Sequence, residues 1–317
     1  MTSLTSSTPP ADLRDLLEHL ATEAVRGDSG ELDLLDTAAQ LAVLDAANAE
    51  AVAVVRAAAP QIAAAVDAIV PRLRDGGRLV YVGAGTAGRM GVLDASEIPP
   101  TFGTDPALVV GLIAGGDRAL RHSVEDAEDD PGAGAADLAA IGLSSRDAVV
   151  GISASGRTPY VVGALRHARE AGALTIGFAC NADSEIARVA ELAIETVVGP
   201  EVVTGSTRLK GGTAQKLVLN AVSTLAMVRL GKVHGNLMVD VRATNAKLRA
   251  RAERIVRLAT GVDADAAAAA LAACDGRVKP AILVTLTGVS PEVATERLAR
   301  EDGVLRAALR GIIDETR

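Results

Sequence analysis

Five short apolar runs, separated by helical stretches, constrain the fold more than any other feature of this 317-residue chain. The runs are RLVYV at 78–82, LVVGLI at 108–113, AVVGI at 148–152, LTIGF at 174–178 and LAIETVV at 192–198. Each is almost wholly apolar, which is typical of a parallel strand buried on both faces. Such strands alternating with helices predict an α/β fold, a doubly wound five-stranded parallel sheet in the flavodoxin-like order 2-1-3-4-5.

Helical periodicity occupies the segments around these runs. It predicts helices at 35–58, 61–74, 159–171 and 184–190, with Pro60 in a first turn. After Pro200 we expect the chain to be helical throughout, with helices over 212–231 and 240–260 and three or four short ones from 261 to 317. The predicted organisation is a disordered tail over residues 1–10, an α/β domain with N-terminal helices over 11–258 and a small helical domain over 259–317.

Composition limits the possible partners. The net charge is −8 and no basic stripe is visible, which argues against nucleic acid. The two cysteines are far apart and the four histidines are scattered, so neither a disulfide framework nor a metal site is expected. With no secretory leader and no uncharged apolar stretch of about 18 residues, we expect a cytoplasmic protein without a membrane partner.

Two loops carry the residues best suited to bind a ligand. The first, GAGTAG at 83–88, follows the first strand, and the second, SASGRT at 153–158, follows the third. Strands one and three flank the point where the strand order reverses, so both loops are expected at one crevice. Glycines permit close backbone approach, and amides at helix N-termini bind phosphate. The candidate phosphate contacts are Gly85, Thr86, Ser153, Ser155, Gly156 and Thr158.

The first loop also matches the dinucleotide pattern G-x-G-x-x-G, which is weak by itself. A dinucleotide site would place an acidic residue at the end of the second strand, where Gly115 and Gly116 stand instead. The hydroxyl-rich second loop suits one phosphate monoester better than a pyrophosphate. Neither a phosphate-binding-loop lysine motif nor a G-x-S-x-G elbow is present, so nucleotide hydrolysis and serine-esterase chemistry lose support.

Carboxylates near the crevice are candidates for acid–base catalysis. Glu97 lies in DASEIPPTFG, and the segment VEDAEDD contributes Glu125, Glu128 and aspartates. Taken alone, Glu97 is also explained as a solvated helix-end carboxylate, and the acidic segment as an exposed helix face. The residue pattern leaves these alternatives open.

Longer motifs give a resemblance. VGAGTAGRMGVLDASEIPPTFG, GISASGRTPYV, EVVTGSTRLKGGTAQKLVLN and GKVHGNLMVDVRATNAKL together resemble the N-acetylmuramic acid 6-phosphate etherases, within the wider sugar isomerase (SIS) families. The match spans residues 20–260. It implies an SIS fold, a homodimer, a sugar-phosphate substrate, no metal or redox cofactor, and cleavage of a D-lactyl ether at C3 of the sugar.

The resemblance also assigns roles to residues. The family's catalytic acid corresponds to Glu97, and its second catalytic glutamate corresponds to Glu128, with Glu125 less favoured. Two positions depart from the family: Ala87 stands where a serine is usual, and Asp126 where a glycine is usual. Asp126 adds a negative charge that would raise the pKa of Glu128 if the two approach. An aldose–ketose isomerase and a sugar-phosphate-sensing regulator remain the competing interpretations.

Overall fold

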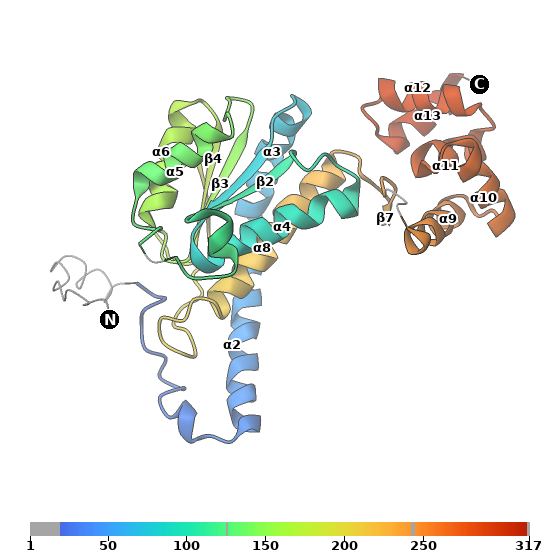
Figure 1. Cartoon of the computed structure of the whole chain (residues 1–317). Coiled ribbons are helices and arrows are strands. Elements are labelled where there is room, and N and C mark those ends of the chain that lie inside the picture. Colours follow the sequence, from blue (N-terminus) through green and yellow to red (C-terminus); the bar gives the residue numbers. More distant parts are fainter. Residues whose placement is uncertain (1–19, 125, 242–244, 316–317) are drawn as a thin grey trace. The chain divides into compact units, whose positions relative to one another are not determined.

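The computed structural model describes residues 20–124, 126–241 and 245–315, and its contacts group into two compact units (Figure 1). The first unit comprises the chain up to Asp94 together with Gly111–Val222, and the second comprises Ala95–Val110 together with the chain from Ser223 onward. The long helices α4 (Gly85–Phe102) and α8 (Lys210–Arg229) contribute residues to both units. The expected tail at 1–10 lies outside the described residues, and the division into domains over 11–258 and 259–317 stays a prediction.

A parallel sheet forms the centre of the first unit. Its strands are β1 (Leu79–Gly83), β2 (Val109–Ile113), β3 (Ala148–Ser153), β4 (Leu174–Ala179) and β5 (Leu192–Glu195). Their order is β2-β1-β3-β4-β5, which confirms the predicted fold class and strand order. Every residue of β1, β3 and β4 is buried, as their apolar runs predicted. The edge strand β5 ends three residues earlier than expected, and Val197 beyond it is exposed.

Helices α2 (Thr37–Ala57), α3 (Ala59–Arg74), α5 (Pro131–Ala140), α6 (Pro159–Glu170) and α7 (Glu185–Val189) complete the first unit. Figure 1 shows α5 and α6 side by side at one side of the sheet. Two glycines allow this close approach. A Cβ on Gly134 would lie 2.0 Å from the Tyr160 carbonyl oxygen, and one on Gly163 would lie 1.9 Å from that of Pro131. Pro60 stands in the first turn of α3, as predicted.

The second unit is less uniformly helical than the sequence suggested. A two-stranded antiparallel hairpin, β6 (Val233–His234) and β7 (Leu237–Met238), interrupts the helices at Gly235, whose φ is +61°. Helix α9 (Ala246–Thr260) begins after an Asn245 cap instead of near Asp240. The four short helices that follow agree with the prediction: α10 (Ala264–Ala273), α11 (Val278–Thr287), α12 (Pro291–Arg300) and α13 (Leu305–Glu315).

Within the described part of the chain, α2 alone is long and apolar enough to cross a membrane by length and composition. The core helix of a soluble protein can have the same length and composition. The helix also carries charged residues, and Glu50 on it binds two basic side chains of the first unit, Arg26 and Lys210.

Asp147 joins the beginnings of the two central strands. Its buried carboxylate accepts hydrogen bonds from the backbone amides of Arg78 and Ser144, each at 2.8 Å, and from the Arg78 guanidinium at 2.8 Å. Burial opposes ionisation, but these donors outweigh it and hold the pKa of Asp147 below its usual value. The carboxylate therefore secures β1 beside β3 at the amino ends of both strands.

We expect Asp147→Asn to lower the free energy of unfolding by about 2–4 kcal/mol, because Arg78 loses a buried anionic partner. The folded-state pKa is depressed, so this contribution is present above the unfolded pKa of about 4 and is lost as pH falls through the folded value. Urea unfolding at several pH values measures both effects. Glu185→Gln, which removes a partly exposed partner of Arg166, is the control and should cost less than about 1 kcal/mol. Equal losses in the two variants would contradict the assignment.

Candidate active site

The two glycine- and hydroxyl-bearing loops meet at one cavity because of how β1 and β3 pair. The strands are parallel, with Gly83 opposite Ile152, so both chains leave the sheet at its carboxyl edge. A cavity of about 340 Å³ lies there. Its lining includes Ala84, Gly85, Thr86 and Ala87 of the first loop and Ser153, Ala154, Ser155 and Thr158 of the second. The structure thus brings the predicted loops together.

The first loop turns directly from β1 into α4, and two glycines make the turn possible. A Cβ on Gly83 would lie 2.7 Å from the amide nitrogen of Gly88, and one on Gly88 would lie 2.6 Å from the side chain of Ile113. Strand and helix therefore pack in direct backbone contact. Gly85 begins α4 with a φ of +51° at the cavity wall, where the amides of a helix N-terminus can face an anion.

The second loop gathers three hydroxyl groups. Ser153 Oγ lies 2.8 Å from Thr158 Oγ1 and 3.2 Å from Ser155 Oγ, and it accepts the Gly156 amide at 3.0 Å. Gly156 has a φ of +74°, and a Cβ there would lie 2.3 Å from Cβ of Ser184. Because Thr158 precedes the first turn of α6, hydroxyls and helix amides converge. This combination suits a phosphate group.

Gln215, which sequence reasoning missed, forms another wall. It lies on α8, is 1% exposed and lines the cavity, yet its Oε1 has no hydrogen-bond partner among the described residues. Leaving a buried carboxamide oxygen unpaired costs free energy. Among the described residues Thr104 Oγ1 and Ser223 Oγ are unpaired as well, but neither of those residues lines this cavity, so we expect the partner of Gln215 to be a ligand donor. Nothing in the sequence signals this role, because one glutamine within a helical pattern is ordinary until the helix is placed.

Buried charges fix the N-terminus of α8, and therefore Gln215. The fully buried carboxylate of Glu201 accepts the backbone amides of Lys210 and Gly211, both at 2.9 Å. The buried Lys210 ammonium binds Glu50 at 2.8 Å, and Arg26 binds the same carboxylate with two hydrogen bonds of 2.8 Å. The bonds from Arg26, and then those from Lys210, lower the pKa of Glu50 to about 2.

Glu23 is a further carboxylate at this cavity that sequence analysis did not single out. Its position follows from Asn181, whose side-chain amide donates at 3.0 Å both to Thr22 Oγ1 and to the Ala154 carbonyl. One buried asparagine thus ties the N-terminal segment to the serine loop. The partner is 159 residues away in sequence, so no local pattern could indicate it.

Glu128 and Gly85 both line this cavity and also an adjoining one of about 290 Å³. The segment around it forms turns, which corrects the interpretation of these acidic residues as a helix face. Asp126 adopts a φ of +60°, which explains why glycine suits that position and why aspartate is tolerated. The alternative base, Glu125, lies outside the described residues.

Glu97, the predicted catalytic acid, is exposed on α4, in the portion of that helix that belongs to the second unit. The helix continues through Pro99 and Pro100 to Phe102, so Glu97 is not at its end. Ala87 is buried at the cavity wall and presents a methyl group where the resemblance predicted a hydroxyl. Across the described ranges, no group of three or more His, Cys, Asp or Glu side chains is arranged to hold a metal ion.

The doubly wound sheet and its two loops match two family models that describe an SIS domain. The N-terminal SIS domain of glucokinase regulatory protein matches residues 61–169, and the SIS domain matches residues 132–225. Among solved structures, a phosphoheptose isomerase from Francisella tularensis is 17% identical, with a TM-score of 0.45 over 60% of this chain and 98% of that one. A protein of Bacteroides fragilis described as a "putative phosphosugar isomerase involved in capsule formation" is 25% identical, with a TM-score of 0.42 over 53% of this chain and 79% of that one.

Whole-chain relatives specify the family. The chain is 58% identical to an N-acetylmuramic acid 6-phosphate etherase of Streptomyces avermitilis over 96% of this chain and 98% of the relative. It is 56% identical to the protein of that name from Pectobacterium atrosepticum, over 88% and 92%. This protein therefore belongs to the N-acetylmuramic acid 6-phosphate etherase family, as the resemblance of its motifs predicted.

Two variants test the candidate phosphate contacts and the expected ligand contact of Gln215 separately. We expect Ser155→Ala/Thr158→Ala to weaken binding of both inorganic phosphate and a hexose 6-phosphate, by about tenfold or more per lost charge-assisted hydrogen bond. Gln215→Leu should weaken only the hexose phosphate, because a carboxamide oxygen repels an anion but accepts from a sugar donor. Isothermal titration calorimetry measures both ligands.

Thermal unfolding supplies the control for these variants. Gln215→Leu should not lower the melting temperature of the free protein, since it removes an unpaired buried oxygen. Loss of both binding and stability would make Gln215 a packing residue, and unchanged hexose-phosphate binding would remove it from the site.

Proposed function

We propose that this protein cleaves the D-lactyl ether of N-acetylmuramic acid 6-phosphate to give N-acetylglucosamine 6-phosphate and D-lactate. The observation that carries the proposal is one cavity that holds a phosphate-type pair of loops together with a carboxylate, Glu128. Membership of the etherase family supplies the substrate. In this proposal Gly85, Thr86, Ser153, Ser155, Gly156 and Thr158 bind the 6-phosphate, and Gln215 contacts the sugar.

Elimination of lactate followed by hydration accounts for the reaction. When the sugar ring opens to the aldehyde, the proton on C2 becomes acidic because the carbanion that forms is an enolate. A base removes this proton, the bond between C3 and the ether oxygen breaks, and an acid protonates the departing lactate. Water then adds to C3 of the unsaturated aldehyde, and a proton returns to C2. The sum is one water consumed for one ether bond cleaved.

We assign Glu128 as the base and Glu97 as the acid. The loops hold the phosphate end of the sugar, and a carboxylate at the same cavity then faces its carbon skeleton. An ether oxygen is a poor leaving group, so a second carboxyl that delivers a proton completes the chemistry. Neither role requires a metal or a redox cofactor.

The same proposal places the protein in the cytoplasm, in cell-wall recycling, as a homodimer without nucleic-acid or membrane partners. Helix α2 is rich in alanine and partly exposed, and it offers an apolar surface that a second copy could cover, with Leu41 56% and Val52 43% exposed. Sedimentation of the purified protein at its chain mass of 32.2 kDa would contradict the dimer.

Replacing either glutamate by glutamine should reduce kcat by about 10²–10⁴-fold, or roughly 3–5 kcal/mol of barrier, because shape is kept while proton transfer is lost. Release of D-lactate measures turnover, and it also separates an etherase from an isomerase or a regulator. Glu170→Gln, at the exposed last position of α6, is the control for a general loss of charge. Near-normal turnover by a folded Glu128→Gln protein would transfer the base role to Glu125 or Glu23.

Isotopes distinguish elimination from displacement at the lactyl carbon. In H₂¹⁸O the sugar product should carry the label at C3 while lactate remains unlabelled, and in deuterated water the sugar should gain deuterium at C2. Mass spectrometry of both products reads the result. Labelled lactate with an unlabelled sugar would overturn elimination and leave the substrate assignment intact, whereas absence of lactate release would refute the function itself.

A further inference from the structure

The second unit contains a cavity with an unusual excess of positive charge. It measures about 350 Å³ and is lined by residues of the loop after β7, of α11 and of α12. Three basic side chains, Lys232, Arg277 and Lys279, line it, against one acidic residue among the described lining, Asp240. None of the lining residues belongs to the two phosphate-type loops. The lining thus carries a formal charge of +2, three positive groups less one negative.

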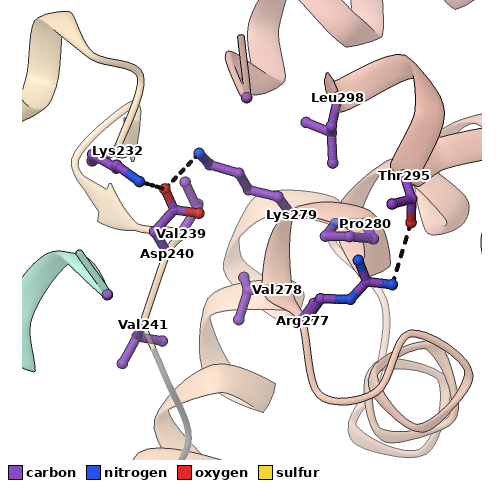
Figure 2. A pocket seen from close by; sticks show the side chains of 12 residues that line it. Lys232, Val239, Asp240, Val241, Arg277, Val278, Lys279, Pro280, Thr295 and Leu298 are labelled. Atoms are coloured by element: carbon purple, nitrogen blue, oxygen red, sulfur yellow. Dashed lines mark hydrogen bonds and ion pairs between the residues drawn. The ribbon is translucent and has the colours of Figure 1, made fainter. Parts of the chain in front are cut away.

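The lysines share one carboxylate oxygen, as Figure 2 shows. Lys279 Nζ lies 2.7 Å and Lys232 Nζ lies 3.0 Å from Oδ2 of Asp240. The Lys279 side chain is only 7% exposed, and desolvation, partly offset by Asp240, lowers its pKa. One carboxylate neutralises one ammonium, so this half-buried cluster retains a net positive charge that water screens poorly.

The beginning of α11 adds to this field. Val278, Lys279 and Pro280 form its first turn and line the cavity, and no described side chain caps that end. Arg277, just before the helix, donates to Thr295 Oγ1 at 3.3 Å and keeps half of its side chain exposed. Asp275 lies 3.9 Å from it but is 88% exposed, so its effect is screened. The positive helix end and the guanidinium both favour an anion.

We propose that this cavity is a second anion site, which binds the phosphate group of a small molecule between Lys232, Lys279 and Arg277. A dianion matches the formal charge of +2, and ammonium and guanidinium groups provide charge-assisted donors. Val239, Val278 and Leu298, each at most 7% exposed, offer an apolar wall for a short carbon skeleton. The site is additional to the one that holds the substrate and does not depend on the proposed reaction.

The test is a phosphate titration of the full-length protein in the Ser155→Ala/Thr158→Ala background, which weakens the loop site. In this background, isothermal titration calorimetry at low ionic strength should still detect inorganic phosphate binding to the cavity of the second unit. Adding Lys232→Gln and Arg277→Gln makes the lining neutral but keeps the Lys279–Asp240 pair, so the protein should fold. We expect this change to weaken phosphate binding by about tenfold or more. Circular dichroism checks the fold.

Arg300→Gln is the matched control, since Arg300 is exposed at the end of α12 and does not line the cavity. It should leave phosphate binding unchanged. Equal weakening by Arg300→Gln would mean that phosphate binding depends only on the net charge of the protein. Unchanged binding in the Lys232→Gln/Arg277→Gln protein would mean that phosphate binds outside this cavity. Either result overturns the proposal. Competition by glycerol 3-phosphate distinguishes a phosphate ester from free phosphate as the ligand. Displacement of inorganic phosphate identifies an ester site, and failure to displace it identifies a site for the free anion.

Discussion

The parallel pairing of β1 with β3 is the constraint on which the candidate site depends. With Gly83 opposite Ile152, the chain leaves both strands at neighbouring points on one edge of the sheet. The strand order reverses there, so the loops diverge and leave a cavity between them. Every residue of β1 and β3 is buried, so a register shift of one residue would exchange side chains of different size between two packed faces and break their fit.

The cavity at this edge is built by charged and polar groups from distant parts of the chain. Asn181 holds the N-terminal segment against the serine loop, while Glu201 caps α8 and so positions Gln215. These buried groups are hydrogen-bonded, as their desolvation requires. Oε1 of Gln215, by contrast, has no hydrogen-bond partner among the described residues, and our proposal pairs it with a donor of the bound sugar.

Sequence patterns predicted the sheet better than the region after it. Buried parallel strands are continuous apolar runs, so all five were recognised, and the strand order followed from the fold class. The hairpin at Val233–Met238 was missed because each of its strands has two residues, too few to show alternation. The start of α9 was placed too early because Val239 and Val241 are buried without being helical. Buried positions in turns are apolar as well, so an apolar residue by itself does not indicate a helix.

By itself the sequence determined the α/β class, the two glycine- and hydroxyl-bearing loops that line one cavity, and the family whose motifs it shares. It could do so because strand burial and glycine-dependent turns leave local patterns. Only the tertiary structure decided that Glu23 and Gln215 join those loops, that Asp126 occupies a left-handed turn close to Glu128 in the chain, and that two lysines share Asp240. Most of these relations join residues far apart in the chain. They arise from packing and charge pairing in three dimensions, and no local sequence pattern indicates them.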